Sequence, residues 1–136
     1  MAKYIYPAQF VKEENGQYSV DFPDLESCYT SGDDLSEAIS MAEDVLAYVL
    51  YDYEKEGREI PEPSNINVMR DEMRLAENEF INYIHCDTIE YQKRNSNKAV
   101  KKTLTIPEWL NEMATKDGLN FSQILQEALM SKLNLK

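Results

Sequence analysis

The sequence predicts an α+β protein, with an N-terminal β-β-β-α-β unit followed by a smaller β-α-α unit. Three observations support this class. Apolar residues alternate at period two before residue 31, recur at helical spacing from 35 to 53, and return to a strand pattern near residue 80. A polar stretch then separates residues 1–92 from residues 100–136. With 136 residues, the chain can hold one ordinary domain or two small ones.

Three strands are expected at the start of the chain. Residues 3–12 are aromatic and β-branched, and Pro7 within them indicates an edge position or a bulge. An Asn-Gly hairpin turn leads into a second strand, residues 17–22, with alternating apolar side chains. A short third strand is expected near residues 27–30, ending in a turn at residues 31–33.

The helix that follows carries signals at both ends. Asp34 is expected to cap it, with Glu37 three residues later completing a capping-box pattern. Gly57 is a natural C-terminal stop. Helical spacing predicts one inward stripe, made of Leu35, Ala38, Ile39, Ala42, Val45, Leu46, Val49 and Tyr53.

The second half of this unit is less regular. Residues 65–78 fit either a short helix or a loop. Residues 80–91 are rich in β-formers and predict the fourth strand. Polar residues without periodicity then predict a linker at 93–99.

The C-terminal unit begins with a strand pattern at residues 101–106. Pro107 suits the start of a helix that runs to about Lys116 and ends at Asp117-Gly118, and Asn120 is expected to cap a second helix. Thirty-nine residues from Lys98 onward are too few to fold alone without a metal or disulfide. We therefore expect a homodimer in which these strands pair antiparallel. Its expected core contains Leu104, Ile106, Trp109 and Leu125.

Charge divides the chain in the same place. Residues 1–97 hold 8 Lys and Arg against 21 Asp and Glu, whereas residues 98–136 hold 6 against 4. The net charge of −11 argues against nonspecific nucleic-acid binding by the whole molecule. An acidic body with a slightly basic tail suggests two different partners, although an acidic surface also serves solubility.

The residue types argue against catalysis and metal binding. Cys28 and Cys86 lack a CxxC pattern and are expected to be buried free thiols, so no cofactor or metal is expected. The carboxylates near residue 24 flank a proline turn and would converge poorly on metal ions, as a nuclease requires. The single histidine, His85, is expected to be structural. No apolar run approaches the roughly 18 residues that a membrane span needs, so we expect a cytoplasmic, reduced protein.

The C-terminal segment resembles a ribbon-helix-helix DNA-binding module from about Val100 to Leu133. The strand, the Thr-Ile-Pro helix entry, the Asp-Gly turn and the Asn-Phe-Ser start of the second helix carry this resemblance. It implies that the outward strand residues Lys101, Thr103 and Thr105 contact bases in the major groove. It also implies that Asn120, Phe121 and Ser122 present backbone N–H groups to phosphate.

The body resembles the HicB family of antitoxins. The landmarks are a Tyr-Pro-Ala strand, Val-Asp-Phe-Pro-Asp-Leu-Glu-Ser-Cys at 20–28, Gly-Asp-Asp-Leu-Ser-Glu-Ala at 32–38, and Ile-Pro-Glu-Pro-Ser at 60–64. The resemblance implies a partial RNase H-like domain that binds a small basic HicA toxin, an mRNA interferase, and blocks its catalytic histidine. It also implies that the tail represses the operon by binding operator DNA.

Two questions stay open at this level. Acidic residues of the long helix (Asp44, Asp52 and Glu56) either contact the toxin or form a solvated face. The chain could instead be a stand-alone transcriptional regulator whose acidic body senses a ligand or oligomerises. Two of the three expected base contacts are threonines, which favours two dimers side by side on DNA as a tetramer.

Overall fold

The structure is a computed structural model that describes residues 2–96 and 98–135. The chain forms two compact units, residues 1–98 and residues 99–136. Each unit is described by itself. The boundary lies inside the linker predicted at 93–99.

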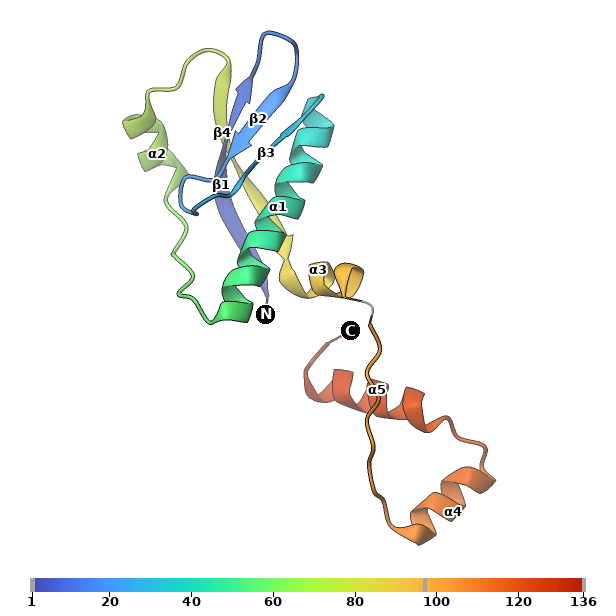
Figure 1. The fold of residues 1–136 in the computed structure, drawn as a ribbon. Helices are drawn as coiled ribbons and strands as arrows, with labels where there is room; N and C mark the ends of the chain where they lie inside the picture. The colour runs from blue at the N-terminus through green and yellow to red at the C-terminus, as the bar shows by residue number, and fades with distance from the viewer. Residues whose placement is uncertain (1, 97, 136) are drawn as a thin grey trace. The chain divides into compact units, whose positions relative to one another are not determined.

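The N-terminal unit is built on a four-stranded antiparallel sheet with the order β3-β2-β1-β4 (Figure 1). The strands are β1 (Lys3–Lys12), β2 (Tyr18–Asp21), β3 (Tyr29–Gly32) and β4 (Glu79–Asp87). Helix α1 (Leu35–Glu56) packs along one face of this sheet and encloses the main core with it. The mixed α+β class predicted from the sequence is therefore confirmed.

Strand β1 lies inside the sheet, yet its proline has edge geometry. Strand β2 pairs with β1 only from Gln9 to Lys12. Pro7 lies opposite Tyr83 of β4, outside the part of β1 that pairs with β2. A residue without an N–H group is tolerated there because no ladder bond is required of it on that side.

The predicted ends of α1 are confirmed. The Asp34 carboxylate accepts a hydrogen bond from the Glu37 N–H at 2.8 Å, and the Glu37 carboxylate accepts one from the Asp33 N–H at 3.0 Å. Gly57 ends the helix with φ +68°, a conformation that favours glycine.

The inward face of α1 differs from the predicted stripe. Leu46 and Leu50 are fully buried, and Ala47 is also buried, although Leu50 and Ala47 were not expected inside. Leu35 and Ile39 are exposed, so their predicted inward position is wrong. In the first turns of α1, Ala38 is the residue that packs against β3, and α3 also contacts the helix. Burial therefore follows the neighbouring elements and not the apolar stripe alone.

This difference predicts contrasting effects for two similar truncations. Leu50→Ala should lower the free energy of unfolding by about 2–5 kcal/mol, because it removes a fully buried side chain and leaves a cavity. Ile39→Ala should cost less than about 1 kcal/mol, since its side chain is exposed. Urea unfolding of both variants checks this. Equal losses would contradict the observed orientation of the helix.

The third strand is displaced from its prediction. Strand β3 spans Tyr29–Gly32, so Ser31 and Gly32 belong to a strand and not to the expected turn. The reason is that pairing with β2 continues to the Tyr18–Gly32 pair, and glycine at this position admits a close approach by α1. A Cβ atom there would lie 2.4 Å from the backbone N of Ala38, so the strand continues where only glycine lets the α1 backbone come this close.

Part of the stretch left open at residues 65–78 is helical. Helix α2 (Ile66–Met73) is capped by Asn65, whose side chain accepts from the Asn67 N–H at 2.9 Å. Strand alternation turns Ile81 away from the α1 core, and there α2 packs on β4 with Met69 buried.

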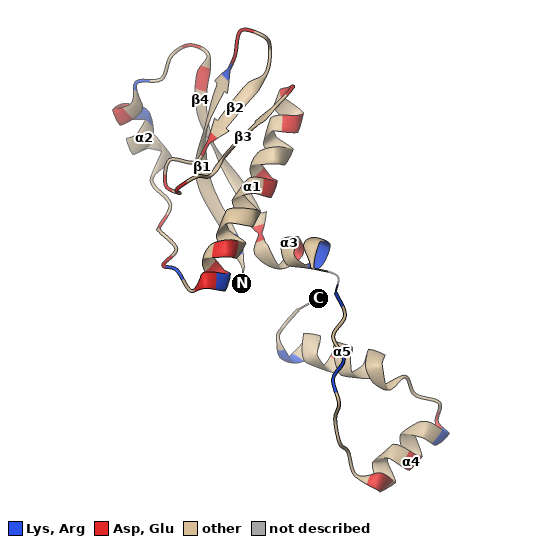
Figure 2. Ribbon diagram, viewed as in Figure 1, with Lys and Arg blue, Asp and Glu red and all other residues tan. Residues whose placement is uncertain are grey.

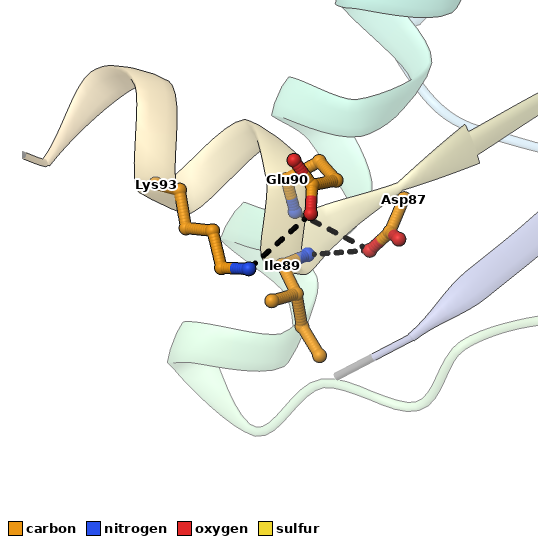
Figure 3. A network of polar contacts seen from close by, with 4 residues as sticks. All are labelled: Asp87, Ile89, Glu90 and Lys93. Atoms are coloured by element: carbon orange, nitrogen blue, oxygen red, sulfur yellow. Dashed lines mark hydrogen bonds and ion pairs between the residues drawn. The ribbon is translucent and has the colours of Figure 1, made fainter. Parts of the chain in front are cut away.

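The end of the predicted fourth strand is wrong. Strand β4 stops at Asp87, and residues Thr88–Asn95 form helix α3. Figure 3 shows the cause: the Asp87 carboxylate accepts from the Ile89 N–H at 2.9 Å and the Glu90 N–H at 3.3 Å. Lys93 then pairs with Glu90 at 3.3 Å, so the first residues of the predicted linker are helical.

The C-terminal unit contains helices α4 (Glu108–Lys116) and α5 (Phe121–Lys132). Pro107 occupies the capping position just before α4, and Gly118 takes φ +67° in the turn after it. The side chain of Asn120 accepts from the Gln123 N–H at 3.0 Å, which confirms the predicted cap of α5.

Candidate functional site

The stretch predicted as a DNA-reading strand runs without hydrogen-bonded strand structure from residue 98 to residue 107. A ladder needs a second edge, and none is provided within the single chain that the structure describes. Lys101, Thr103 and Thr105 are all exposed, as are Leu104 and Ile106 on the alternate positions. Strand pairing with a second copy therefore stays a prediction.

The two helices of this unit leave their apolar side chains uncovered. None of the described residues 99–135 is buried. Of the four expected dimer-core residues, Leu104, Ile106 and Trp109 are 57%, 47% and 62% exposed, and Leu125 is half-buried. An apolar set of this size is typical of a surface that a partner covers.

The residues predicted to contact phosphate lie at the start of α5. Asn120 uses its side-chain oxygen as the helix cap. Phe121 and Ser122 follow as the first helical residues, whose N–H groups lack intrahelical partners. Figure 2 shows Lys and Arg positions along the extended segment of the same unit.

The three acidic candidates on α1 do not form one patch. Asp52 and Glu56 lie one turn apart near the helix end, whereas Asp44 lies two turns earlier. Arg94 of α3 is 3.4 Å from Asp44, and Arg58 is 3.8 Å from Glu56. Both pairs are exposed, so each contributes little to stability and can be exchanged for another cation.

The carboxylates near residue 24 have structural surroundings. Asp24 accepts from the Ser64 N–H at 2.8 Å and from the Ser64 hydroxyl at 2.5 Å, which ties the β2–β3 loop to the connector after α1. Asp21 lies on the exposed face of β2, where partial burial raises its pKa. Within residues 2–96 and 98–135, no three His, Cys, Asp or Glu side chains are placed to hold a metal ion.

The two thiols are buried as expected. Burial raises the pKa of Cys28 and Cys86 to about 12, so both stay protonated and unreactive near neutral pH. His85 differs from its predicted structural role. Its side chain is 79% exposed, and Nε2 lies 3.8 Å from the Glu43 carboxylate.

Sequence patterns missed a cluster of aromatic side chains beside α1. Tyr91 of α3 contacts both Tyr48 and Tyr51, with ring centroids 6.3 and 5.8 Å apart. Tyr48 also stays largely exposed. Helix α3 creates this cluster, and no pattern indicated that helix, so the roles of Tyr51 and Tyr91 could not be assigned from sequence.

Two grooves flank β3. The helix-side groove has a volume of about 390 Å³, and it is lined by Thr30, Met41, Asp44, Val45, Tyr48, Tyr91, Arg94 and Asn95. The open-face groove, on the sheet face away from α1, has a volume of about 470 Å³, and its lining includes Gln9, Val11, Ser19, Asp21, Tyr29 and Ser31. Each groove thus combines a tyrosine with a carboxylate.

Comparison with known proteins identifies the family. Residues 6–128 match the model described as HicB_like antitoxin of bacterial toxin-antitoxin system. The chain belongs to the HicB-like antitoxin family. No helix within the described parts of this HicB-like chain is long and apolar enough to span a membrane.

Individual relatives agree with this assignment. Antitoxin HicB 2 of Photorhabdus laumondii is 42% identical over 59 residues, which cover 43% of this chain and 42% of that protein. Antitoxin HicB 1 of the same organism is 36% identical over 61 residues, covering 45% of this chain and 39% of that protein. The chain thus spans less than half the length of the curated relatives it matches.

Solved structures match over more of the chain. A toxin–antitoxin complex from Streptococcus pneumoniae contains a chain that is 32% identical, with a TM-score of 0.59, covering 96% of this chain and 99% of its own length. A HicA3 and HicB3 toxin–antitoxin complex matches at 26% identity and a TM-score of 0.52, covering 62% of this chain and 99% of that one.

Proposed function

We propose that this HicB-like chain is the antitoxin of a toxin–antitoxin pair and that it represses its own operon. Its N-terminal unit binds and masks a small basic HicA-type toxin, and its C-terminal unit binds operator DNA as a homodimer. The observation that carries the proposal is the family match across residues 6–128, which spans both units.

The charge of the N-terminal unit supports a basic protein partner. Acidic side chains outnumber basic ones by 21 to 8 in residues 1–97, and Figure 2 shows them along α1 and the loops of the sheet. Complementary charge speeds encounter and excludes acidic competitors. Masking needs no chemistry from the antitoxin, so we expect no catalytic residue, no metal and no cofactor in this unit.

The uncovered apolar side chains of the C-terminal unit support dimerisation. Two copies that pair segments 101–106 antiparallel would satisfy the unpaired backbone groups and bring both sets of Leu104, Ile106 and Trp109 together. The alternate side chains, Lys101, Thr103 and Thr105, would then point into the major groove from both strands. Pairing of two such dimers on adjacent half-sites would add the affinity that threonine contacts alone lack.

Substitutions of the groove-facing residues test the DNA contact. Lys101→Ala should weaken specific operator binding by about 1–3 kcal/mol if the lysine contacts guanine, and Thr103→Ala by less. Titration of operator DNA in a mobility-shift assay measures both. Wild-type binding should also weaken with salt, with a log–log slope of about −0.9 per phosphate contact. If both variants bind operator DNA as tightly as the wild type does, residues 101–106 do not contact the major groove.

A co-expression pull-down tests the antitoxin function. The full chain is co-expressed with the product of the neighbouring small reading frame, and that product is also expressed alone. We expect a small basic protein to be retained by the chain and to arrest growth in its absence. A chain that retains no such protein, beside a product that is harmless alone, is a stand-alone regulator instead.

A further inference from the structure

The outer edge of β3 presents free main-chain groups. The Phe22 N–H donates to the Cys28 carbonyl at 3.0 Å, so these two residues form a hydrogen-bonded pair of the antiparallel ladder. Hydrogen-bonded and non-hydrogen-bonded pairs alternate along an antiparallel ladder. Asp21–Tyr29 and Ser19–Ser31 are therefore non-hydrogen-bonded pairs. The N–H and C=O groups of Tyr29 and Ser31 therefore point away from β2, and no hydrogen bond within the described residues occupies them.

The two grooves beside β3 meet at this edge. Tyr29, Thr30 and Ser31 all line the open-face groove, and Thr30 is the residue of β3 that also lines the helix-side groove. Side chains of a strand alternate between the two faces of a sheet. A fifth strand added along β3 would therefore place successive side chains over one groove and then over the other.

Both grooves suit long cationic side chains. Tyr29 is 68% exposed on the open face, and Tyr48 is 56% exposed on the helix side. Asp21 lies in the first groove and Asp44 in the second. An aromatic ring with a nearby carboxylate binds Lys or Arg through cation–π and ionic contacts. The Arg94 that now lies near Asp44 is an exposed partner at 3.4 Å, which another cation can replace.

Charge also decides against a second copy of this chain at the edge. Residues 13–54, which include β2, β3 and all but the last two residues of α1, contain twelve Asp and Glu and no Lys or Arg. Two copies paired through β3 would place these acidic segments side by side, and neither segment contains a basic side chain. A basic partner has the opposite charge and meets no such repulsion.

We infer that β3 is the docking edge for the basic toxin: an extended segment of the toxin adds to the sheet beside Tyr29–Gly32, with Lys or Arg side chains over the two grooves. The inference rests on the proposed antitoxin function and specifies the surface that performs it. Main-chain bonds to Tyr29 and Ser31 supply affinity, and the grooves select for alternating basic side chains.

Hydrogen exchange on the wild-type chain tests the docking edge directly. The probe is the small basic protein that co-purifies with the full chain. We expect exchange of the Tyr29 and Ser31 amides to slow at least ten-fold in the complex, whereas the amides of Val20 and Thr30, already paired in the ladder, change little. Unchanged exchange at Tyr29 and Ser31 in a formed complex overturns the inference. The inference is also overturned if these amides become protected when the concentration of the chain is raised without the basic protein. That result would show that a second copy of the chain pairs with the edge.

A proline substitution in β3 provides a second test of the docking edge. Ser31→Pro removes an outward N–H group that the β2–β3 ladder does not use, and edge strands tolerate proline. We expect at least ten-fold weaker binding of the basic protein. The control Ser36→Pro makes the same exchange in the first turn of α1, where the N–H group is also unpaired, and should bind as the wild type does.

Failure of the inference and failure of the proposed function give different results. Equal binding by Ser31→Pro, Ser36→Pro and the wild type would disprove the docking edge and leave the antitoxin function intact. A wild-type chain that retains no basic protein would disprove both.

Discussion

Ile106→Asn should disrupt the proposed homodimer and abolish operator binding at the same time. Each dimer would lose two apolar side chains from the seam, and each is worth about 1.5–3 kcal/mol when buried. The dimer dissociation constant should therefore rise by roughly 100-fold or more. Sedimentation measures the dimer, and the fluorescence of Trp109, the chain's single tryptophan, should shift toward that of a solvated indole. Leu104→Asn should behave in the same way.

Thr105→Asn is the matched control for this result. It introduces the same side chain one position away, on the face predicted to contact bases. The variant should stay dimeric while its operator binding changes. Because asparagine is uncharged, none of these substitutions alters the electrostatic attraction to DNA. Dimeric Ile106→Asn protein, or monomeric Thr105→Asn protein, would reverse the predicted faces of the segment.

Gly32→Ala should destabilise the N-terminal unit by about 3 kcal/mol. The added Cβ would lie 2.4 Å from the N and 2.7 Å from the Cα of Ala38, and 2.8 Å from the carbonyl carbon of Glu37. All three are backbone atoms of α1, so the start of the helix must move away from β3 to relieve the contact. The Tm should fall by roughly 12–24 °C for a unit of this size.

Near-ultraviolet circular dichroism of tyrosine isolates the effect on this unit. All nine tyrosines of the chain lie between residues 4 and 91, whereas Trp109 is in the other unit. Ser31→Ala changes the neighbouring exposed residue of the same strand and should leave the Tm within a few degrees of wild type. A Gly32→Ala variant with the same Tm as this control would show that α1 can shift with little loss of stability.

The sequence predicted the structure correctly where interactions between residues close together in the sequence determine it. The caps at Asp34 and Asn120 and the stop at Gly57 depend on side chains within four residues, and all three are as predicted. Strand alternation likewise placed Val20 and Phe22 in the core. The expected sites differ in this respect. Lys101, Thr103 and Thr105 are exposed, but their role depends on a second copy and on DNA.

What the sequence by itself determined is the division into an acidic α+β unit and a small basic unit, the type of most elements, and the helix ends. Only the tertiary structure decided which side of α1 is buried, that β3 extends to Gly32, and that α3 replaces the end of the fourth strand. The physical reason is that these features depend on contacts between different helices and strands. Gly32 meets Ala38 across a turn, Thr88 bonds to Ala2 at 2.8 Å, and Tyr91 reaches Tyr48 from another helix. No local pattern encodes such contacts, and through them β3 borders both grooves and α3 lines the helix-side groove.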